Sequence, residues 1–381
     1  MTIAKNGILR SLVAGGALVA SAIAAPIFAA DAGLPNPIKF LSIQDLTGLA
    51  GKPGSDTKLG MDLAVEEINK SNLLGASKIE MTYRDSATNP GQGASLMSTA
   101  IGQRNAVVFG SVTSNVAIAQ APIAQRGRQP VIFTQAGSKG ILEAGNFIYR
   151  ATPIQLDYQH LTVDWMKKNG IKRLAILTDT NIPTINDLRV VYKDLAPKAG
   201  ISIILDEETQ TTSTDISTQI TKMIESRPDA ALVMLLTGRT VTGVSQLRQN
   251  GFKGRIVGMQ GMGGNVLAPL GAMADGIVWS TDFNAAQTNP GAVKFVAAFK
   301  AKYGGQVPGF FSAEGYDAVH FAALGVKKAN SVDPDAVIKG LDAVGAEGFE
   351  GAAGVVKFSG RQQAGAGTVV EWRNGAEVPV R

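Results

Sequence analysis

The chain has 381 residues, of which 45% are hydrophobic and 18% charged, enough apolar material for one large or two ordinary globular domains. It contains no cysteine and two histidines, which excludes cysteine-based zinc sites, iron–sulfur clusters and metal sites built from three histidines. The formal net charge is +5, but lysines and arginines are interspersed with acidic residues, so the charge gives little support to nucleic-acid binding.

Residues 1–30 have the layout of a secretory signal peptide. Lys5 and Arg10 come first, an uncharged stretch rich in alanine, leucine, valine and glycine follows, and small residues end the segment at Ala29-Ala30. A membrane anchor is the alternative, but the uncharged stretch is short for a span that needs about 20 apolar residues. We therefore expect cleavage near Ala29 or Ala30 and an exported protein that resides in the periplasm.

After Pro37, short apolar runs typical of strands alternate with helical segments. Strands are expected at Ile38–Ile43, Lys78–Arg84, Ala106–Phe109 and Pro130–Phe133. In the helix expected near residues 56–69, apolar residues recur at i, i+3, i+4 and i+7 from Met61 to Ile68, which places one apolar stripe against a sheet. This pattern indicates βαβ units.

The alternation starts again after Tyr149-Arg150. The expected strands are Arg173–Thr178, Ile201–Leu205, Ala230–Leu236 and Arg255–Gly258, and the expected helices are Leu156–Lys168, Asp187–Lys198 and Asp215–Ser226. The last third adds helices at Pro290–Tyr303 and Ser312–Ala329 and strands at Val355–Phe358 and Thr368–Trp372. Two consecutive sets of β and α elements predict an α/β protein with two doubly wound parallel-sheet lobes, whose compact connections would permit a hinge motion.

Two loops carry candidate binding chemistry. Gly110 to Asn115 follows one expected strand and precedes the expected helix Val116–Gln125. Hydroxyl residues before a helix are ordinarily caps, but the same arrangement offers free N–H groups and the positive end of the helix dipole to an anion such as a carboxylate. Ser138, in Ala136-Gly137-Ser138-Lys139-Gly140, is close to the nucleophile elbow of a serine hydrolase, yet Lys139-Gly140 is a poor helix start. A secreted serine hydrolase therefore remains an alternative.

Taken together, several segments resemble the type I periplasmic solute-binding proteins of ABC importers, the branched-chain amino-acid (Leu/Ile/Val) binding family. The segments are Asp45-Leu46-Thr47-Gly48, Gly60–Asn69, Thr113–Ala121 with Pro130-Val131-Ile132, and Gly315-Tyr316-Asp317-Ala318. The resemblance implies two lobes joined by three crossovers, near Arg150–Pro153, Thr281–Phe283 and Phe349–Gly351. It assigns residues 37–152 and 282–349 to the N-terminal lobe, and residues 153–281 and 350–381 to the C-terminal lobe.

The resemblance also implies a ligand site between the lobes. Ser114 matches the serine whose hydroxyl and amide hold the ligand carboxylate, Ser138 would add a second hydroxyl and amide, and Ala136 would offer its carbonyl to an ammonium group. Phe311 matches an aromatic residue that lines the side-chain pocket. The remaining candidates for ligand binding are Thr113, Gln155, Gln260, Arg239 and Asp45.

The sequence departs from the family pattern at several of these positions. Gln260 aligns with the acidic residue that usually pairs with the ligand's amino group, and an ammonium buried beside glutamine would lose its ionic partner at a cost of several kcal/mol. Pro183-Thr184 stands where a Tyr-Gly pair is common, and Pro53 replaces an aromatic gate. Arg239 could point into the cleft and favour an acidic or hydroxyl group, or it could be a solvated arginine in the first turn of the following helix.

These observations predict a periplasmic receptor, not an enzyme, that captures an amino acid or a related organic or aromatic acid and delivers it to the membrane subunits of an ABC importer. A receptor for an amide- or urea-type solute is an alternative within the same class. We expect no cofactor, no metal and no nucleic-acid partner, and a monomer.

Overall fold

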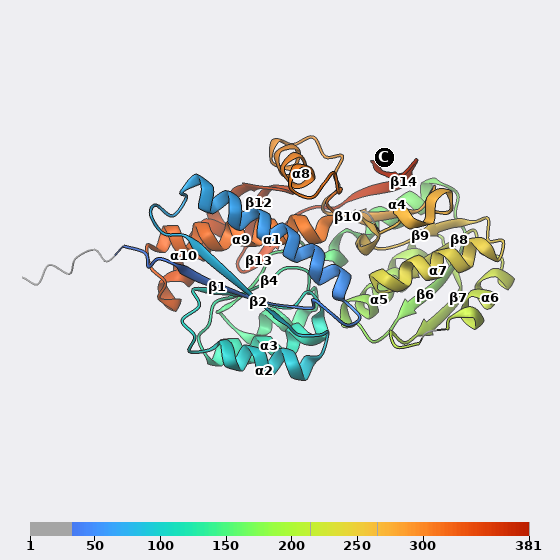
Figure 1. Cartoon of the computed structure of the whole chain (residues 1–381). Coiled ribbons are helices and arrows are strands. Elements are labelled where there is room, and N and C mark those ends of the chain that lie inside the picture. The colour runs from blue at the N-terminus through green and yellow to red at the C-terminus, as the bar shows by residue number, and fades with distance from the viewer. Residues whose placement is uncertain (1–32, 214, 265, 381) are drawn as a thin grey trace, which may run out of the picture. The chain divides into compact units, whose positions relative to one another are not determined.

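The strands of the protein form two sheets in the computed structural model, which describes residues 33–213, 215–264 and 266–380 (Figure 1). The predicted signal peptide lies outside the described residues. Gly33–Arg381 group into one compact unit. None of the helices within the described ranges combines the length and the apolar character needed to cross a membrane.

The first sheet has the strand order β11-β12-β13-β5-β4-β3-β1-β2 in the described chain. Its strands are β1 (Ile38–Gln44), β2 (Ile79–Asp85), β3 (Val107–Phe109), β4 (Val131–Phe133), β5 (Ile148–Arg150), β11 (Phe349–Gly351), β12 (Gly354–Ser359) and β13 (Gln362–Ala364). Six neighbouring strands of this sheet are parallel, namely β13, β5, β4, β3, β1 and β2. At one edge β12 pairs antiparallel with β13, and β11 pairs antiparallel with β12.

The second sheet has the order β15-β14-β10-β9-β8-β6-β7. Its strands are β6 (Arg173–Asp179), β7 (Ser202–Thr209), β8 (Ala230–Met234), β9 (Arg255–Val257), β10 (Val278–Thr281), β14 (Thr368–Arg373) and β15 (Ala376–Pro379). Five neighbouring strands are parallel, namely β7, β6, β8, β9 and β10. At one edge β14 pairs antiparallel with β10, and β15 pairs antiparallel with β14. Both sheets are therefore mainly parallel, as predicted, and mixed at one edge.

The first strand of each set lies inside its sheet, with β2 and β3 on either side of β1 and with β7 and β8 on either side of β6. This reversal of strand order confirms the doubly wound prediction. β1 is buried at six of its seven positions and β6 likewise. Strands buried on both faces are mostly apolar, which explains why apolar runs marked them in the sequence.

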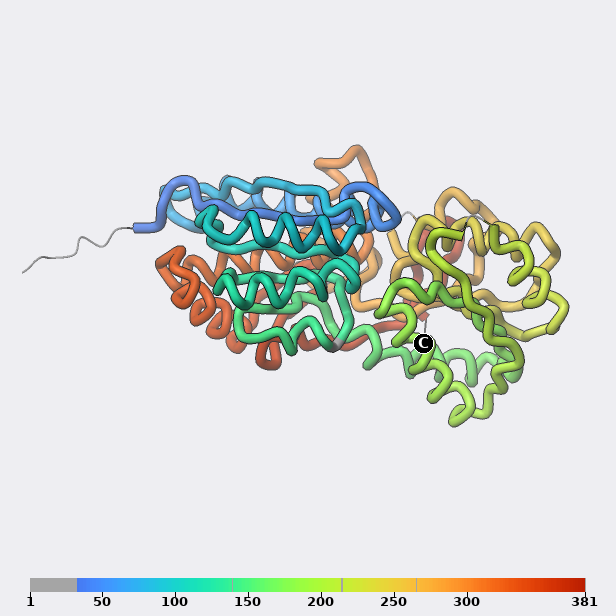
Figure 2. The backbone as a smooth tube through the Cα atoms, turned by 90° about the horizontal axis from the view of Figure 1, so that it is seen from below, coloured from blue at the N-terminus to red at the C-terminus, as the bar shows by residue number. Residues whose placement is uncertain are grey.

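Helices cover both sheets. They are α1 (Gly51–Ser71), α2 (Pro90–Ala100), α3 (Ser114–Arg126), α4 (Gln159–Lys168), α5 (Pro183–Lys198), α6 (Ser217–Glu225), α7 (Thr237–Gln249), α8 (Pro290–Lys302), α9 (Phe310–Ala329) and α10 (Pro334–Glu347). Short 3₁₀ helices occupy Lys139–Ala144, Gln155–Tyr158, Gln260–Met262 and Ala268–Ala274. In Figure 2 the blue, cyan and orange-red segments lie together on one side, and the green-yellow segments lie together on the other.

α1 and α9 pack closely along the first sheet because each carries a glycine at the contact. A Cβ atom on Gly60 would lie 1.8 Å from the carbonyl oxygen of Ser312, and one on Gly315 would lie 2.4 Å from the carbonyl oxygen of Thr57. Only glycine fits at these two positions. The contact fixes the start of α9, which supplies one wall of the site described below.

The chain passes between the sheets three times, after β5, after β10 and after β13. The third passage follows Ala364, because β11, β12 and β13 all belong to the first sheet. The predicted crossover near Phe349–Gly351 and the assignment of residues 350–381 to the C-terminal lobe are therefore wrong. β13 pairs with β5 through Gln362 and Arg150. Alternation along residues 355–358 indicates one buried face, but it cannot say which sheet the strand joins. Strands of three or four residues carry little periodicity. The strands β5, β10, β11, β13 and β15 were not predicted, although β3, β4 and β9, which are equally short, were.

Candidate functional site

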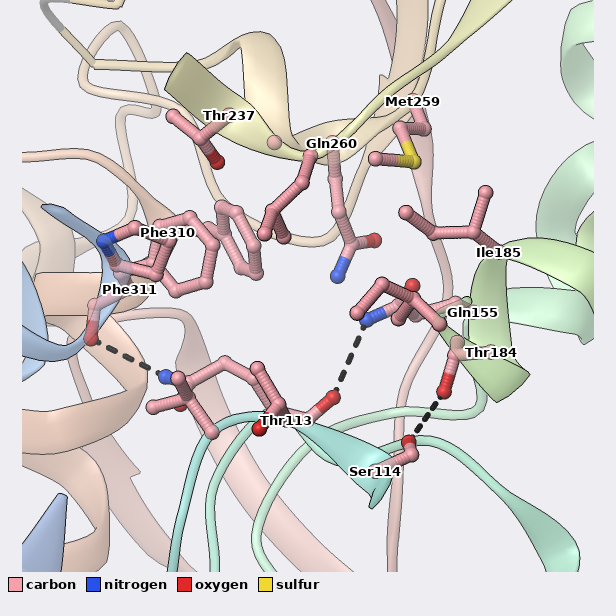
Figure 3. A pocket seen from close by; sticks show the side chains of 16 residues that line it. Thr113, Ser114, Gln155, Thr184, Ile185, Thr237, Met259, Gln260, Phe310 and Phe311 are labelled. Carbon is pink, nitrogen blue, oxygen red and sulfur yellow. Dashed lines mark hydrogen bonds between the residues drawn. The ribbon is translucent and has the colours of Figure 1, made fainter. Parts of the chain in front are cut away.

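The segments that follow strands of both sheets meet at a cleft with a volume of about 530 Å³, including its opening to solvent (Figure 3). It is lined by Pro53, Val112, Thr113, Ser114, Gln135, Gln155, Ile182, Thr184, Ile185, Leu236, Thr237, Met259, Gln260, Gly261, Phe310 and Phe311. All but one of these segments leave the carboxyl end of a strand, where doubly wound sheets bind their ligands. The exception is the start of α9, which follows α8 and supplies Phe310 and Phe311. The volume suits a small organic molecule.

Five helices begin at this cleft and place first-turn residues in its lining, namely α1, α3, α5, α7 and α9. In none of the five does the side chain of the N-cap residue accept a hydrogen bond from the first turn. Of the helices that contribute nothing to the lining, α2, α8 and α10 are capped by Asn89, Asn289 and Asp333, whereas α4 and α6 also lack a side-chain cap. Uncapped helix N-termini carry partial positive charge, so the cleft is suited to an anion.

Asp45 explains why Thr113 does not cap α3. The buried Asp45 carboxylate accepts hydrogen bonds from the Ser111 hydroxyl (2.6 Å), the Thr113 amide (3.2 Å) and the Thr113 hydroxyl (3.1 Å). Burial raises the pKa of Asp45, and hydrogen bonds from Ser111, Ser86 and Thr113 offset part of that rise. Asp45 thus holds the loop that leads into α3 from behind, without lining the cleft.

Ser114 joins the two lobes at the edge of the cleft. Its hydroxyl lies within hydrogen-bonding distance of the Thr184 hydroxyl, which belongs to α5 of the second lobe (Figure 3). The Ser138 amide donates to the same Ser114 oxygen at 3.3 Å. A hydroxyl at the N1 position of α3 that touches both lobes can bind a ligand atom and respond to lobe closure.

Gln260 projects into the cleft from the second lobe and is 3% exposed. Its side-chain oxygen Oε1 accepts a hydrogen bond from the Tyr158 hydroxyl. Its side-chain nitrogen Nε2 is buried and has no hydrogen-bond partner among the residues that the structure describes. The group that faces the cleft is therefore an N–H donor, which suits an oxygen of the ligand and not an ammonium group.

Apolar side chains make up much of the remaining lining. The rings of Phe310 and Phe311 lie with centroids 3.9 Å apart, and Met259, Ile185 and Leu236 line the cleft from the second lobe. Such walls favour a ligand with an aromatic or branched aliphatic body.

No aspartate, glutamate, lysine or arginine lines the cleft within residues 33–213, 215–264 and 266–380. Two buried acids lie behind it at the crossovers. The Thr152 hydroxyl donates to Glu314, and both burial and the neighbouring Asp282 raise the pKa of Glu314 well above its usual range.

The cleft brings together five of the nine predicted ligand-binding residues, namely Thr113, Ser114, Gln155, Gln260 and Phe311. Ala136, Ser138, Asp45 and Arg239 lie outside its lining. The expectation that Arg239 could enter the cleft is wrong, because its guanidinium pairs with the buried Asp179 carboxylate (3.3 Å) and donates to the Gln210 carbonyl oxygen (2.7 Å). Asp179 lies 60 residues earlier in the chain, so no local pattern signals this pair.

The surroundings of Ser138 differ from a hydrolase site in the described part of the chain. Its carbonyl oxygen accepts from Arg150 and its amide donates to Ser114. His160 lies within hydrogen-bonding distance of the Asp157 carbonyl oxygen, and His320 packs against Tyr316, with ring centroids 4.4 Å apart. Neither histidine hydrogen-bonds to Ser138 among the described residues.

Sequence reasoning missed several lining residues and the role of Tyr158. Ile182, Ile185 and Met259 follow β6 and β9, and the positions directly after predicted strands were the available signal. Phe310 adjoins the predicted Phe311. Tyr158 lies outside the lining and carries no local signal, because its hydrogen bond reaches a residue 102 positions away.

A family model described as "Periplasmic binding protein" matches residues 37–377. The "Leu/Ile/Val-binding protein homolog 7" of Brucella melitensis is 24% identical over 95% of this chain and 96% of its own. The substrate-binding protein LivJ of Streptococcus pneumoniae, solved with isoleucine, has a TM-score of 0.82 and 22% identity over 91% of this chain and 100% of its own. A solute-binding protein of an R. palustris ABC transporter, solved with benzoate, has a TM-score of 0.84 and 20% identity over 91% of this chain and 96% of its own. The chain belongs to the periplasmic binding protein family.

Proposed function

We propose that this periplasmic binding protein captures a small organic carboxylate that lacks an α-ammonium group and delivers it to the membrane subunits of an ABC importer. One observation carries the anionic part of the proposal, namely the five helices that begin at the cleft with no side-chain cap while no charged side chain lines it in the described chain. A carboxylate gains from this field of helix ends and from charge-assisted hydrogen bonds to Ser114 and neighbouring amides.

The absence of the ammonium group rests on Gln260. Its Nε2 atom faces the cleft as a buried donor, and no described lining residue carries a negative charge. A buried ammonium beside that donor would lack an ionic partner, which costs several kcal/mol.

The apolar walls support an aromatic or branched aliphatic body for the ligand. Structural relatives were solved with benzoate and with 4-hydroxybenzoate, while others were solved with isoleucine or leucine. The amino-acid class requires a partner for the ammonium group, and Gln260 supplies a donor in that place. The acid class therefore fits the cleft better.

We further propose that residues 1–30 are removed on export, that the protein acts in the periplasm as a monomer, and that it catalyses no reaction. Cell fractionation and N-terminal sequencing test export, because an unprocessed chain retained in the cytoplasm would contradict it.

The experiment that tests the proposed function is a thermal-shift panel on the mature protein. It compares leucine with 4-methylpentanoate, phenylalanine with 3-phenylpropanoate, and benzoate with benzamide. A ligand present at 100 times its Kd stabilises the folded state by about 2.7 kcal/mol. We expect the acids to raise Tm and the amino acids and benzamide to give smaller shifts. Larger shifts with the amino acids would refute the acid class, and a larger shift with benzamide would favour a receptor for neutral amides.

A further inference from the structure

The carboxamide of Gln260 can present either a donor or an acceptor to a ligand, depending on which way it is turned. In the structure Oε1 accepts a hydrogen bond from the Tyr158 hydroxyl. Nε2 points into the cleft (Figure 3) and has no hydrogen-bond partner among the described residues. The discrimination between a carboxylate and an ammonium group therefore depends on what holds the carboxamide in this orientation.

Tyr158 is well suited to hold it. It ends the 3₁₀ helix Gln155–Tyr158 and is 3% exposed. Its ring packs against the third crossover so tightly that a Cβ atom on Gly367 would lie 2.5 Å from ring atom Cδ2. The ring is thus fixed in place, and its hydroxyl is directed at Gln260.

The chemistry of the hydroxyl decides the orientation. Burial, together with Asp282 and Glu314, raises the pKa of Tyr158 well above its usual range, so the hydroxyl keeps its proton. If the carboxamide of Gln260 were turned so that Nε2 faced Tyr158, the Tyr158 hydroxyl would have to accept a hydrogen bond from Nε2. The buried proton of that hydroxyl would then need a different acceptor. Among the described residues the hydroxyl donates only to Gln260, so the turned arrangement leaves that proton unpaired, which is unfavourable.

We propose that Tyr158 is a positioning residue that sets ligand specificity by locking the Gln260 carboxamide with its N–H donor toward the cleft. The inference rests on the proposed function. An unlocked carboxamide could turn its oxygen to an ammonium group, whereas the locked one favours ligand oxygen atoms. Tyr158 does not line the cleft, so it acts through Gln260 alone.

The test is Tyr158→Phe, which removes the hydroxyl and keeps the ring. Calorimetry measures the Kd of 3-phenylpropanoate and of phenylalanine, and the readout is the ratio of the two. We expect this preference for the acid to fall about tenfold in the variant, since one oriented hydrogen bond is lost for the acid and an acceptor becomes available to the amino acid. A ratio equal to that of the wild type overturns the inference.

Tyr149→Phe is the matched control. Tyr149 is also fully buried, its hydroxyl donates to Asp342, and it does not line the cleft, so the ratio should not change. A double-mutant cycle with Gln260→Met separates positioning from general packing. In the Gln260→Met background Tyr158→Phe should have no further effect on the ratio, and an equal effect in both backgrounds overturns the inference.

A second measurement needs no change at Tyr158. In protein labelled with ¹⁵N-glutamine, the side-chain NH₂ signal of Gln260 is the one lost in Gln260→Met. We expect one of its protons to move downfield when 3-phenylpropanoate binds, and an unchanged signal overturns the inference. If the wild type instead prefers phenylalanine, the proposed function fails and the inference fails with it. If the wild type prefers the acid but Tyr158→Phe keeps the ratio, only the inference fails.

Discussion

Gln260→Glu is the substitution that most changes the electrostatics of the cleft while conserving its shape. The glutamate keeps an oxygen to accept from Tyr158 and replaces the Nε2 donor, which has no partner in the described chain, by a second carboxylate oxygen. The variant therefore converts a donor at a 3% exposed position into an anion.

The magnitude follows from the distance between the two charges. In the proposed complex the Gln260 side chain donates to the ligand carboxylate, so the introduced carboxylate would lie about 4 Å from it and repel it by about 4 kcal/mol at an effective dielectric constant of about 20. Loss of one hydrogen bond to an anion adds about 1.5 kcal/mol. The affinity for an organic acid should fall by about 5 kcal/mol, or more than about 1000-fold, and the affinity for the matching amino acid should rise.

Titration calorimetry of 3-phenylpropanoate and phenylalanine measures both changes. Gln103→Glu is the control, because Gln103 is exposed in the turn after α2 and gives the same change in net charge without lining the cleft. Burial raises the pKa of the introduced carboxyl group, so acid binding should recover as the pH falls and that group is protonated. An acid affinity equal to that of the wild type at neutral pH would refute the reasoning.

Three further predictions address the cleft and the fold. Ser114→Ala should weaken acid binding by about 1.5 to 3 kcal/mol in calorimetry through loss of a charge-assisted hydrogen bond, and an unchanged Kd removes Ser114 from the site. Gly309→Ala should weaken ligand binding, because the added Cβ would lie 3.1 Å from the Cα of Gly264 in the other lobe and so hinder lobe closure. The urea unfolding free energy of the ligand-free protein should stay nearly unchanged, and an equal loss of binding free energy and unfolding free energy would contradict this. Burial raises the pKa of Asp317 to about 7, from about 4 in the unfolded chain, so the folded state holds a proton that the unfolded state releases between these values. The unfolding free energy should therefore fall as pH rises from about 4 to about 7. Burial raises the pKa of Glu377 to about 7 as well, so Asp317→Asn should make that slope shallower in urea unfolding without abolishing it, and an unchanged slope would contradict the assignment.

The sequence predicted the parts of the fold that depend on local periodicity. Strands buried on both faces, such as β1 and β6, are mostly apolar, and their alternation with helices indicated two doubly wound lobes. α10 was not predicted, although Asp333 followed by Pro334 is a helix-start signal that the structure uses. The predicted position of the third crossover was wrong, because the sheet that a strand joins depends on long-range pairing. Here that pairing joins Gln362 of β13 to Arg150 of β5.

The site was predictable where one loop carries it. The run from Gly110 to Asn115 follows a strand and begins a helix, and the structure places Thr113 and Ser114 in the cleft lining. The partners of Gln260 and Arg239 were not predictable, because Tyr158 and Asp179 reach them across 102 and 60 residues. Such pairs exist only after the loops of a lobe have been brought together.

Calorimetry on the mature wild-type protein can compare the affinity for leucine and phenylalanine with the affinity for the matching acids without the amino group. A cleft that presents helix N-termini and the Gln260 donor, with no anion in its described lining, should bind at least one acid at least about tenfold more tightly than its amino-acid counterpart. Tighter binding of the amino acids would contradict the account, because it would require an acceptor for the ammonium group in the place where the structure puts a donor.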